Sequence, residues 1–356
     1  MGGASDSMHL YLNTRFYLFG NRRERCIEAR IQGNTGVVIK MALLEVENLK
    51  IYYFTREGAV KAVDDVSFSV DKDETLGLIG ESGCGKTTAV FAIMRFVAPP
   101  GRIVGGKIIF DGNDIIPMSN EEIRLLRGKG IAMVFQAAQN ALNPVMTVGK
   151  QITEVILEHE RVTKEEAWER AKRQLELVGI SGERAKSYPH EFSGGMKQRA
   201  MIAIATACNP RLLILDEPVT GLDVIVQRQL LALINSLRAK MQLPIIFITH
   251  DLSVVAETCD EVAVMYAGKI VEQASTVSLY ENPAHPYSQA LIRAYPSIKG
   301  EKRELKSIPG APPRLINPPI GCRFYPRCPY AVNICREEEP TFRKRDGHLV
   351  ACHLIK

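Results

Sequence analysis

The chain has 356 residues, of which 46% are hydrophobic and 24% are charged, and its formal net charge is +5. This is the composition of an ordinary globular protein, and it excludes a disordered or fibrous chain. No apolar run is long enough to form a membrane-spanning helix, and the weak charge argues against a nucleic-acid binder. Asn13 and Arg15 interrupt the apolar amino terminus, which excludes a secretory signal and predicts a cytosolic protein.

Residues 1–40 mix basic, small and aromatic residues without clear periodicity. Six basic and three acidic residues give this segment +3 of the net charge. Strand-like alternation begins at Met41, a second natural start, in MALLEVENLKIYY. We therefore predict a loosely ordered extension over 1–40, or the product of an upstream start codon. A basic arm that touches a membrane surface is the functional alternative.

Residues 41–280 alternate short β-rich runs with helix-length segments, which predicts an α/β fold around a mostly parallel core sheet. A strand-and-turn pattern at 105–115 predicts an antiparallel β flap. The pattern at about 137–190 predicts a helical subdomain. The β-rich runs are ETLGLIG at 74–80, RLLILDE at 211–217, LPIIFITH at 243–250 and EVAVMYAGKIV at 261–271.

Beyond residue 280 the composition changes. Eleven of the 19 prolines fall in 281–356, and we expect little helix or strand there. An irregular stretch of about 40 residues seldom holds together through a hydrophobic core alone. The sequence therefore predicts a C-terminal extension over 281–356 that something other than a core pins in place.

The stretch GESGCGKTT matches a Walker A phosphate loop between a predicted strand and a predicted helix. Its glycines let backbone N–H groups turn toward phosphate oxygens, and the helix N-terminus adds a favourable dipole. Lys86 is placed to reach the β and γ phosphates, and Thr87 to bind Mg²⁺. An ordinary glycine-rich turn is the disfavoured alternative. The loop comprises Gly80, Glu81, Ser82, Gly83, Cys84, Gly85, Lys86, Thr87 and Thr88.

A second motif, RLLILDEP, reads as a Walker B strand. Its apolar residues aim Asp216 at the Mg²⁺ shell and leave Glu217 beside it, where a carboxylate can act as general base toward water. A buried strand that ends in an acidic turn is the alternative.

A third motif, FSGGMKQR, precedes another predicted helix. Ser193 is a fair N-cap, and Gly194 and Gly195, followed by Met196, expose backbone donors at the helix N-terminus. Alone this would more often be a loop, but beside the other two motifs it predicts a second anion site.

In this order the motifs resemble the nucleotide-binding subunit of an ABC transporter across residues 41–280, although Phe192 and Met196 depart from the usual Leu-Ser-Gly-Gly-Gln signature. The resemblance implies roles for four more residues. Gln136 touches Mg²⁺ and senses the membrane subunits, Asp223 belongs to the D-loop, and His250 contacts the γ-phosphate. Tyr53 stacks on adenine, with its neighbours Tyr52 and Phe54 as the alternatives. Taken singly, Gln136 reads as a strand-end cap, His250 as a sheet-edge histidine and Tyr53 as core.

The resemblance also implies partners. The Ser193–Met196 signature caps the γ-phosphate held by a second ATPase subunit, expected to be a paralogue, so that two cassettes close head-to-tail around ATP. Opening and closure drive two transmembrane permease subunits, and indirectly an extracytoplasmic substrate-binding protein. The expected location is the cytoplasmic face of the cell membrane, without nucleic acid as a partner.

Three further stretches resemble the oligopeptide, dipeptide and nickel importer branch: GESG in the phosphate loop, ALNPVMTVG, and NPAHPYSQAL at 282–291. Ala137 and Ala138 depart from the acid and proline usual after the Q-loop glutamine. We therefore expect an ATPase that powers uptake of short peptides. The alternatives are the same engine serving nickel or oligosaccharide import, and a non-transport ABC ATPase, which the 56 residues between Gln136 and Ser193 disfavour.

Four cysteines close the chain with the spacing C-x5-C-x6-C-x16-C: Cys322, Cys328, Cys335 and Cys352. In a reducing compartment this clustering indicates a metal, and the spacing alone leaves zinc and an iron–sulfur cluster equally open, with four free thiols as the lesser alternative. The resemblance favours a [4Fe-4S] cluster, with a structural role rather than a redox one. Arg323 and Arg327 are expected to offset the thiolate charge, and His348 or His353 is the alternative ligand to a cysteine. Of the remaining cysteines, Cys84 in the phosphate loop is a candidate for oxidation.

Overall fold

The computed structural model describes residues 28–31, 37–40, 42–136, 141–294 and 308–355. Within the predicted N-terminal extension, β1 (Glu28–Ile31) and β2 (Val37–Lys40) pair as an antiparallel ladder. Most of that extension lies outside the described residues, as do Ala137 and Ala138. No helix in the described part of the chain combines the length and the apolar character needed to cross a bilayer.

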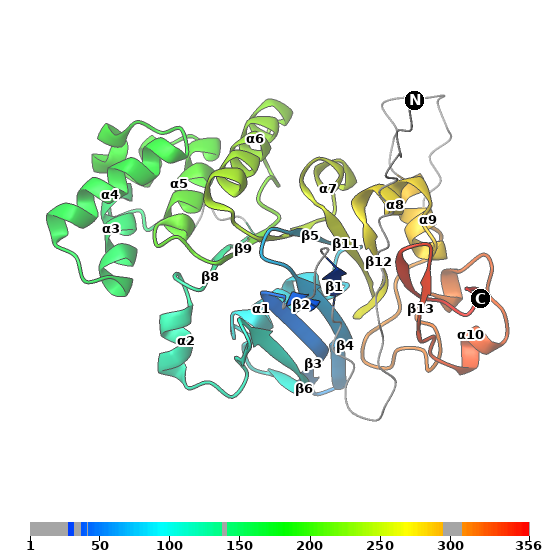
Figure 1. Ribbon diagram of the computed structural model, residues 1–356. Helices are drawn as coiled ribbons and strands as arrows, with labels where there is room; N and C mark the ends of the chain where they lie inside the picture. The colour runs from blue at the N-terminus through cyan, green and yellow to red at the C-terminus, as the bar shows by residue number, and fades with distance from the viewer. Residues whose placement is uncertain (1–27, 32–36, 41, 137–140, 295–307, 356) are drawn as a thin grey trace, which may run out of the picture.

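An eight-stranded mixed sheet forms the centre of the molecule, in the order β13-β14-β12-β11-β5-β10-β9-β8 (Figure 1). Its parallel strands are buried along their length because helices and a second sheet cover both faces. These strands confirm the predicted parallel core. They are β5 (Thr75–Ile79), β8 (Ile131–Val134), β9 (Leu212–Asp216), β10 (Ile245–Thr249) and β11 (Glu261–Tyr266).

A separate antiparallel sheet confirms the predicted β flap. Its order is β4-β3-β6-β7, and long runs of alternating burial along β3 show that one face packs inward. The apolar face shares a core with helix α1 (Lys86–Ile93), which follows the phosphate loop. The strands are β3 (Leu44–Thr55), β4 (Gly58–Val70), β6 (Gly101–Phe110) and β7 (Asn113–Asp114), and α2 (Asn120–Leu126) follows them.

Helices fill the region where the helical subdomain was predicted. α3 (Val148–His159) and α4 (Lys164–Leu177) pack together at one end of the molecule (Figure 1). Thr163 caps α4 by accepting the Glu166 N–H, and acidic residues occupy the first turn, where the helix dipole favours them. Two 3₁₀ turns, Gly182–Lys186 and Pro189–Glu191, lead from α4 to α5 (Gly194–Thr206).

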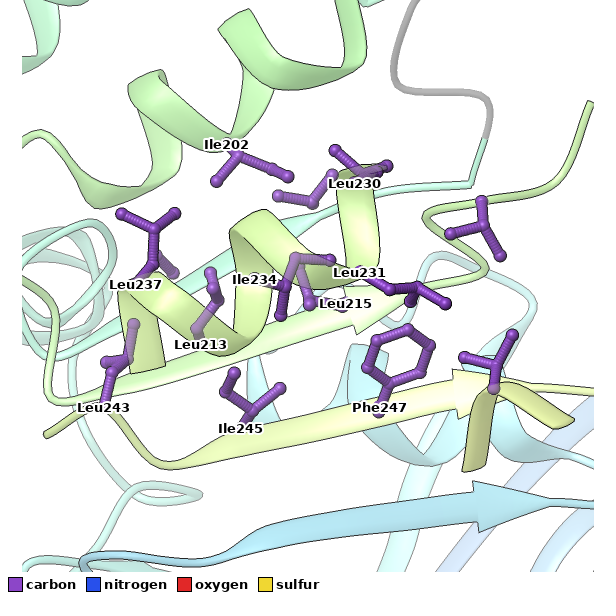
Figure 2. Close-up of a cluster of buried hydrophobic side chains, with 14 of the residues drawn as sticks. Ile202, Leu213, Leu215, Leu230, Leu231, Ile234, Leu237, Leu243, Ile245 and Phe247 are labelled. Carbon is purple, nitrogen blue, oxygen red and sulfur yellow. The ribbon is translucent and has the colours of Figure 1, made fainter. Parts of the chain in front are cut away.

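Helix α6 (Val224–Met241) lies along the sheet and carries its apolar side chains toward β9 and β10 (Figure 2). The spacing of these residues, three or four apart, puts them on one helix face. Figure 2 shows Leu230, Leu231, Ile234 and Leu237 of α6 beside Leu213 and Leu215 of β9 and Ile245 and Phe247 of β10, with Ile202 of α5 nearby. α7 (Leu252–Thr258) follows β10.

The prediction of little helix or strand in the C-terminal extension was wrong, because this segment contains both. The hairpin of β13 (Phe342–Arg345) and β14 (His348–Ala351) extends the central sheet, because β14 pairs with β12 (Lys269–Ser275). Helix α8 (Thr276–Glu281) leads into the extension, whose other elements are α9 (Pro286–Arg293), a 3₁₀ turn at Tyr325–Arg327 and α10 (Ile334–Glu337).

Packing also holds the extension, contrary to the expectation that no core reaches it. Phe324 is fully buried and its ring lies 5.2 Å from that of Tyr266 and 5.4 Å from that of Tyr287. His348 of β14 contacts the buried Glu272 of β12 at 2.7 Å. Sheet pairing, aromatic packing and buried polar contacts therefore attach this segment to the cassette.

Candidate functional site

The phosphate loop connects β5 to α1, and its backbone leaves no room for side chains at two glycines. Gly80 has φ +150°, and a Cβ there would lie 2.0 Å from the Met265 carbonyl oxygen. Gly85 has φ +105°, and a Cβ there would lie 2.2 Å from the Ala62 carbonyl oxygen. Both positions require glycine, so the tight loop that a phosphate cradle needs is built into the backbone.

Lys86 is buried inside this loop. Its Nζ donates to the carbonyl oxygens of Gly80 at 2.7 Å and Glu81 at 3.0 Å. The loop thus curls around a cationic centre, as a site for a polyphosphate requires.

Asp216, at the end of β9, faces the start of α1. The Thr87 hydroxyl donates to its Oδ1 at 3.2 Å, while its Oδ2 is buried without a hydrogen-bond partner among the described residues. Burial, reinforced by the neighbouring Glu217, raises the pKa of Asp216 to about 6. The Thr87 hydroxyl and the carboxylate oxygen of Asp216 that lacks a hydrogen-bond partner are both oxygen ligands of the kind that Mg²⁺ prefers.

Two other predicted site residues, Gln136 and His250, contact the Glu217 carboxylate. Gln136 Nε2 donates to Glu217 Oε2 at 3.0 Å, and His250 Nδ1 lies 3.1 Å from Glu217 Oε1. Gln136 follows β8 and His250 follows β10, so the carboxyl ends of neighbouring parallel strands bring the three side chains together. Thr220, which the sequence reading missed, also donates to Glu217 Oε2, at 3.1 Å.

The signature residues lie at the start of α5. Ser193 caps the helix by accepting the Met196 N–H at 3.3 Å, and both Ser193 and Gly194 are exposed, whereas Phe192 is buried. A Cβ on Gly195 would meet Val226 of α6 at 2.6 Å. The structure does not bring this motif into contact with the phosphate loop within the described part of the chain.

Asp223 caps α6, accepting the N–H groups of Ile225 at 3.1 Å and Val226 at 3.0 Å. The close approach of Gly195 to Val226 places this cap beside the signature helix. Two exposed apolar residues, Val224 and Ile225, follow Asp223 directly and are each 71% exposed.

Tyr53 packs with the core of the antiparallel sheet and lies against Gly101, where an added Cβ would be 2.7 Å from its ring. Its neighbour Tyr52 points elsewhere and donates its hydroxyl to Asp64 at 2.6 Å. Phe54 is exposed. The adenine role of Tyr53 stays a prediction.

The four C-terminal cysteines form no disulfide bonds, and neighbouring thiols affect one another's pKa values. Burial raises the pKa of Cys322 to about 11, with Cys335 and Cys352 adding to the rise, and burial and then Cys335 raise the pKa of Cys328. The Cys322 N–H donates to the Cys335 carbonyl at 2.8 Å. In the described ranges, no three His, Cys, Asp or Glu side chains form a group that would hold a metal ion.

Neither arginine beside these cysteines is placed to offset thiolate charge, which corrects the expectation. Arg323 pairs with Asp64 of β4, and Arg327 pairs with Glu81 of the phosphate loop. Both guanidinium groups therefore form ion pairs with carboxylates of the cassette. Nothing in the sequence near either arginine indicates its partner.

The two histidines proposed as alternative ligands already have partners. His348 contacts Glu272, and His353 Nε2 lies 2.9 Å from the Glu338 carbonyl oxygen.

Comparison with known proteins gives two matches to family models. The model described as "ABC transporter" matches residues 63–220, and the model described as "Oligopeptide/dipeptide transporter, C-terminal region" matches residues 271–335.

Curated relatives match along most of their length. The oligopeptide transport ATP-binding protein OppD of Bacillus subtilis is 49% identical over 318 residues, which cover 88% of this chain and 89% of that protein. OppD of Escherichia coli is 46% identical, over 87% of this chain and 93% of its own. The dipeptide transport ATP-binding protein DppD of Escherichia coli is 44% identical, over 88% of this chain and 97% of its own.

Solved structures share the fold. CbiO1 of Clostridium perfringens, part of the ABC transporter complex cbiONQ, has a TM-score of 0.60 and 26% identity over 68% of this chain and 91% of its own. The ATP-binding cassette MJ0796 bound to ADP and Pi has a TM-score of 0.59 and 23% identity over 65% of this chain and 98% of its own. The predicted ABC cassette fold is confirmed.

Proposed function

Because this chain belongs to the family of ATP-binding subunits of oligopeptide and dipeptide ABC transporters, we propose that it hydrolyses ATP to ADP and phosphate to power peptide uptake. The observation that carries the chemistry is the Glu217 carboxylate, held by Gln136 and His250 at the strand ends next to the phosphate loop.

Each residue has a role in this reaction. Lys86 and the loop amides hold the β and γ phosphates, and Thr87, Asp216 and Gln136 hold Mg²⁺, which neutralises phosphate charge when bound. Glu217 accepts a proton from the attacking water, whose oxygen bonds to the γ phosphorus as the bond to the ADP oxygen breaks. His250 orients Glu217 and contacts the γ-phosphate.

A second cassette completes the site. Ser193 and Gly194 are exposed at a helix N-terminus, where backbone N–H groups attract an anion, and the half-buried Gly195 and Met196 follow them. The exposed apolar pair that follows Asp223 also suits a surface covered by a partner. We expect a head-to-tail dimer with a paralogous subunit in which each signature caps the ATP held by the other.

The assembly we propose lies at the cytoplasmic face of the cell membrane. There the dimer binds two transmembrane permease subunits, and through them it serves a substrate-binding protein on the other side. Support comes from the relatives, whose names are those of oligopeptide and dipeptide transport proteins.

The test of catalysis is Glu217→Gln in the full chain. We expect ATP binding to persist and hydrolysis to fall by about 10²–10⁴-fold, because the water loses its base while the phosphate cradle is intact. Phosphate release and nucleotide affinity are measured together, with Glu257→Gln, an exposed carboxylate on α7, as the control. Normal phosphate release by Glu217→Gln would refute the role.

We further propose that Cys322, Cys328, Cys335 and Cys352 hold a [4Fe-4S] cluster with a structural role. The hydrogen bond from the Cys322 N–H to the Cys335 carbonyl, at 2.8 Å, brings two of the four together, and their wide spacing in the sequence suits the corners of a cluster. Anaerobically purified protein is expected to contain about four irons per chain and to absorb broadly near ~400 nm. Cys335→Ser should lose this iron and Cys208→Ser should keep it; a colourless wild-type protein with one zinc overturns the proposal.

A further inference from the structure

Glu81, the second residue of the phosphate loop, is held by two residues of the C-terminal extension. Its N–H donates to the Tyr287 hydroxyl at 2.9 Å. Its carboxylate accepts two hydrogen bonds from Arg327, at 2.7 Å and 3.0 Å. A forked pair of this kind fixes both the position and the orientation of the carboxylate.

Arg327 is built into its place. Its side chain is only 4% exposed, and Nε donates to the Pro309 carbonyl at 2.8 Å. Another guanidinium nitrogen lies 3.3 Å from the Tyr266 hydroxyl, and the Tyr266 ring lies 4.6 Å from that of Tyr287. The two residues that hold Glu81 are thus packed through one aromatic side chain, so they act as a single rigid support.

Glu81 in turn holds the loop lysine, because its carbonyl oxygen and that of Gly80 accept from Lys86 Nζ. The amide, the carboxylate and the carbonyl of this one residue are therefore all engaged. An unpaired carboxylate at this point would also repel a polyphosphate, since charges a few ångströms apart interact strongly where water is partly excluded.

We propose that Arg327 and Tyr287 are positioning residues for the nucleotide: they fix Glu81, and through it Lys86, and Arg327 neutralises a carboxylate that would otherwise oppose phosphate binding. This inference rests on the proposed ATPase function. On this proposal, the C-terminal extension contributes to nucleotide binding by fixing the phosphate loop.

A second contact from the same segment points the same way. Arg323 donates to the Ala267 carbonyl, and the next residue, Gly268, donates its N–H to the Cys84 carbonyl of the phosphate loop at 2.9 Å. Arg323 follows Cys322 and Arg327 precedes Cys328. The segment 322–328 therefore reaches the loop at two residues, directly at Glu81 and through Ala267 and Gly268 at Cys84.

The test is MgADP affinity of the full chain, measured by titration calorimetry for wild type, Arg327→Met and the double variant Glu81→Gln/Arg327→Met. We expect Arg327→Met to weaken binding about tenfold, and less at high salt, because the freed carboxylate is screened. The double variant should bind at least about threefold more tightly than Arg327→Met, because it lacks the repelling charge. Arg336→Met, which changes an exposed arginine elsewhere in the C-terminal extension, is the matched control and should bind like wild type.

Tyr287→Phe keeps the packed ring and removes only the acceptor of the Glu81 N–H. It should weaken MgADP binding about fivefold, and it decides the matter if Arg327→Met does not fold. Wild-type affinity in Arg327→Met or in Tyr287→Phe overturns the inference, and so does a double variant no better than Arg327→Met. A wild-type chain that does not bind MgADP refutes the proposed function instead.

Discussion

At the scale of single residues, the glycines of the phosphate loop differ in what they tolerate. Gly80 combines a positive φ with a carbonyl oxygen 2.0 Å from the place of a Cβ, whereas Gly83 has φ +77° and open space around it. A side chain at Gly80 must displace backbone of β11, but one at Gly83 only adds conformational strain.

We therefore expect Gly80→Ala to lower the free energy of unfolding by more than about 3 kcal/mol and to abolish nucleotide binding. Gly83→Ala is the control and should cost about 1 kcal/mol, the price of a left-handed alanine. Urea unfolding monitors the first effect and MgADP titration the second. Equal losses in the two variants would contradict the role of the Met265 contact.

At the scale of elements, carboxylates gather where β5 and β11 begin. Glu74 precedes β5 and accepts the Asp71 N–H at 2.7 Å, and Asp260, just before β11, accepts the Thr75 N–H at 2.8 Å. Burial, and then the nearby Asp71, Glu261 and Asp260, raise the pKa of Glu74 from 4.5 to about 7. The folded chain thus holds a proton that the unfolded chain releases near pH 4.5.

This proton makes stability depend on pH. The stabilising contribution is fully present below pH 4.5 and is lost as the pH rises to about 7, because the folded state then has to ionise a buried carboxyl. Glu74→Gln can still accept the Asp71 N–H but no longer titrates. From pH 4.5 to 7, its free energy of unfolding should therefore fall by about 2 kcal/mol less than that of the wild type. Urea unfolding from pH 4.5 to 7.5 measures the difference, with the exposed Glu57→Gln as control; parallel curves for Glu74→Gln and wild type would rule it out.

At the scale of the whole molecule, one apolar core runs from the helical region to the C-terminal extension. It includes Ile152 of α3 and Ala167 of α4 at one end, and Tyr287 and Phe324 at the other. The Arg323–Asp64 pair adds a buried link from the extension to the antiparallel sheet. Burial would raise the pKa of Asp64, but the Tyr52 hydrogen bond and the Arg323 charge lower it.

We expect Arg323→Met to lower the free energy of unfolding by about 3 kcal/mol, because it leaves the buried Asp64 carboxylate without its ion-pair partner and with only the Tyr52 hydrogen bond. Since the core is continuous, the loss should register far away, at Trp168 of α4, the one tryptophan of the chain. Tryptophan fluorescence and far-ultraviolet circular dichroism should shift together on heating. A shift in circular dichroism with unchanged fluorescence would mean that the extension unfolds alone.

The parts of the site that the sequence predicted well are those encoded by neighbouring residues. The phosphate loop and the Asp216–Glu217 pair follow apolar runs directly, and parallel strands bring such ends to one edge of a sheet. Gln136 and His250 have no local signal, so only their order relative to the other motifs identified them.

The parts that it did not predict depend on contacts across the chain. Arg327 and Glu81 are 246 residues apart, and nothing near either residue indicates the other. The β13–β14 hairpin did have a local signal, since Asp346–Gly347 is a favoured turn pair and both residues have positive φ. The exposed, charged β13 concealed it, because a strand without an apolar face lacks the usual alternation.

The support of Glu81 by Tyr287 and Arg327 also bears on how the protein is made. A ribosome releases the amino-terminal part of a chain first, and the two supporting residues follow Glu81 by 206 and 246 positions. During translation the nucleotide loop is therefore complete in sequence long before its support exists. A truncated or still-nascent cassette would thus hydrolyse ATP slowly, and full activity would require the finished polypeptide.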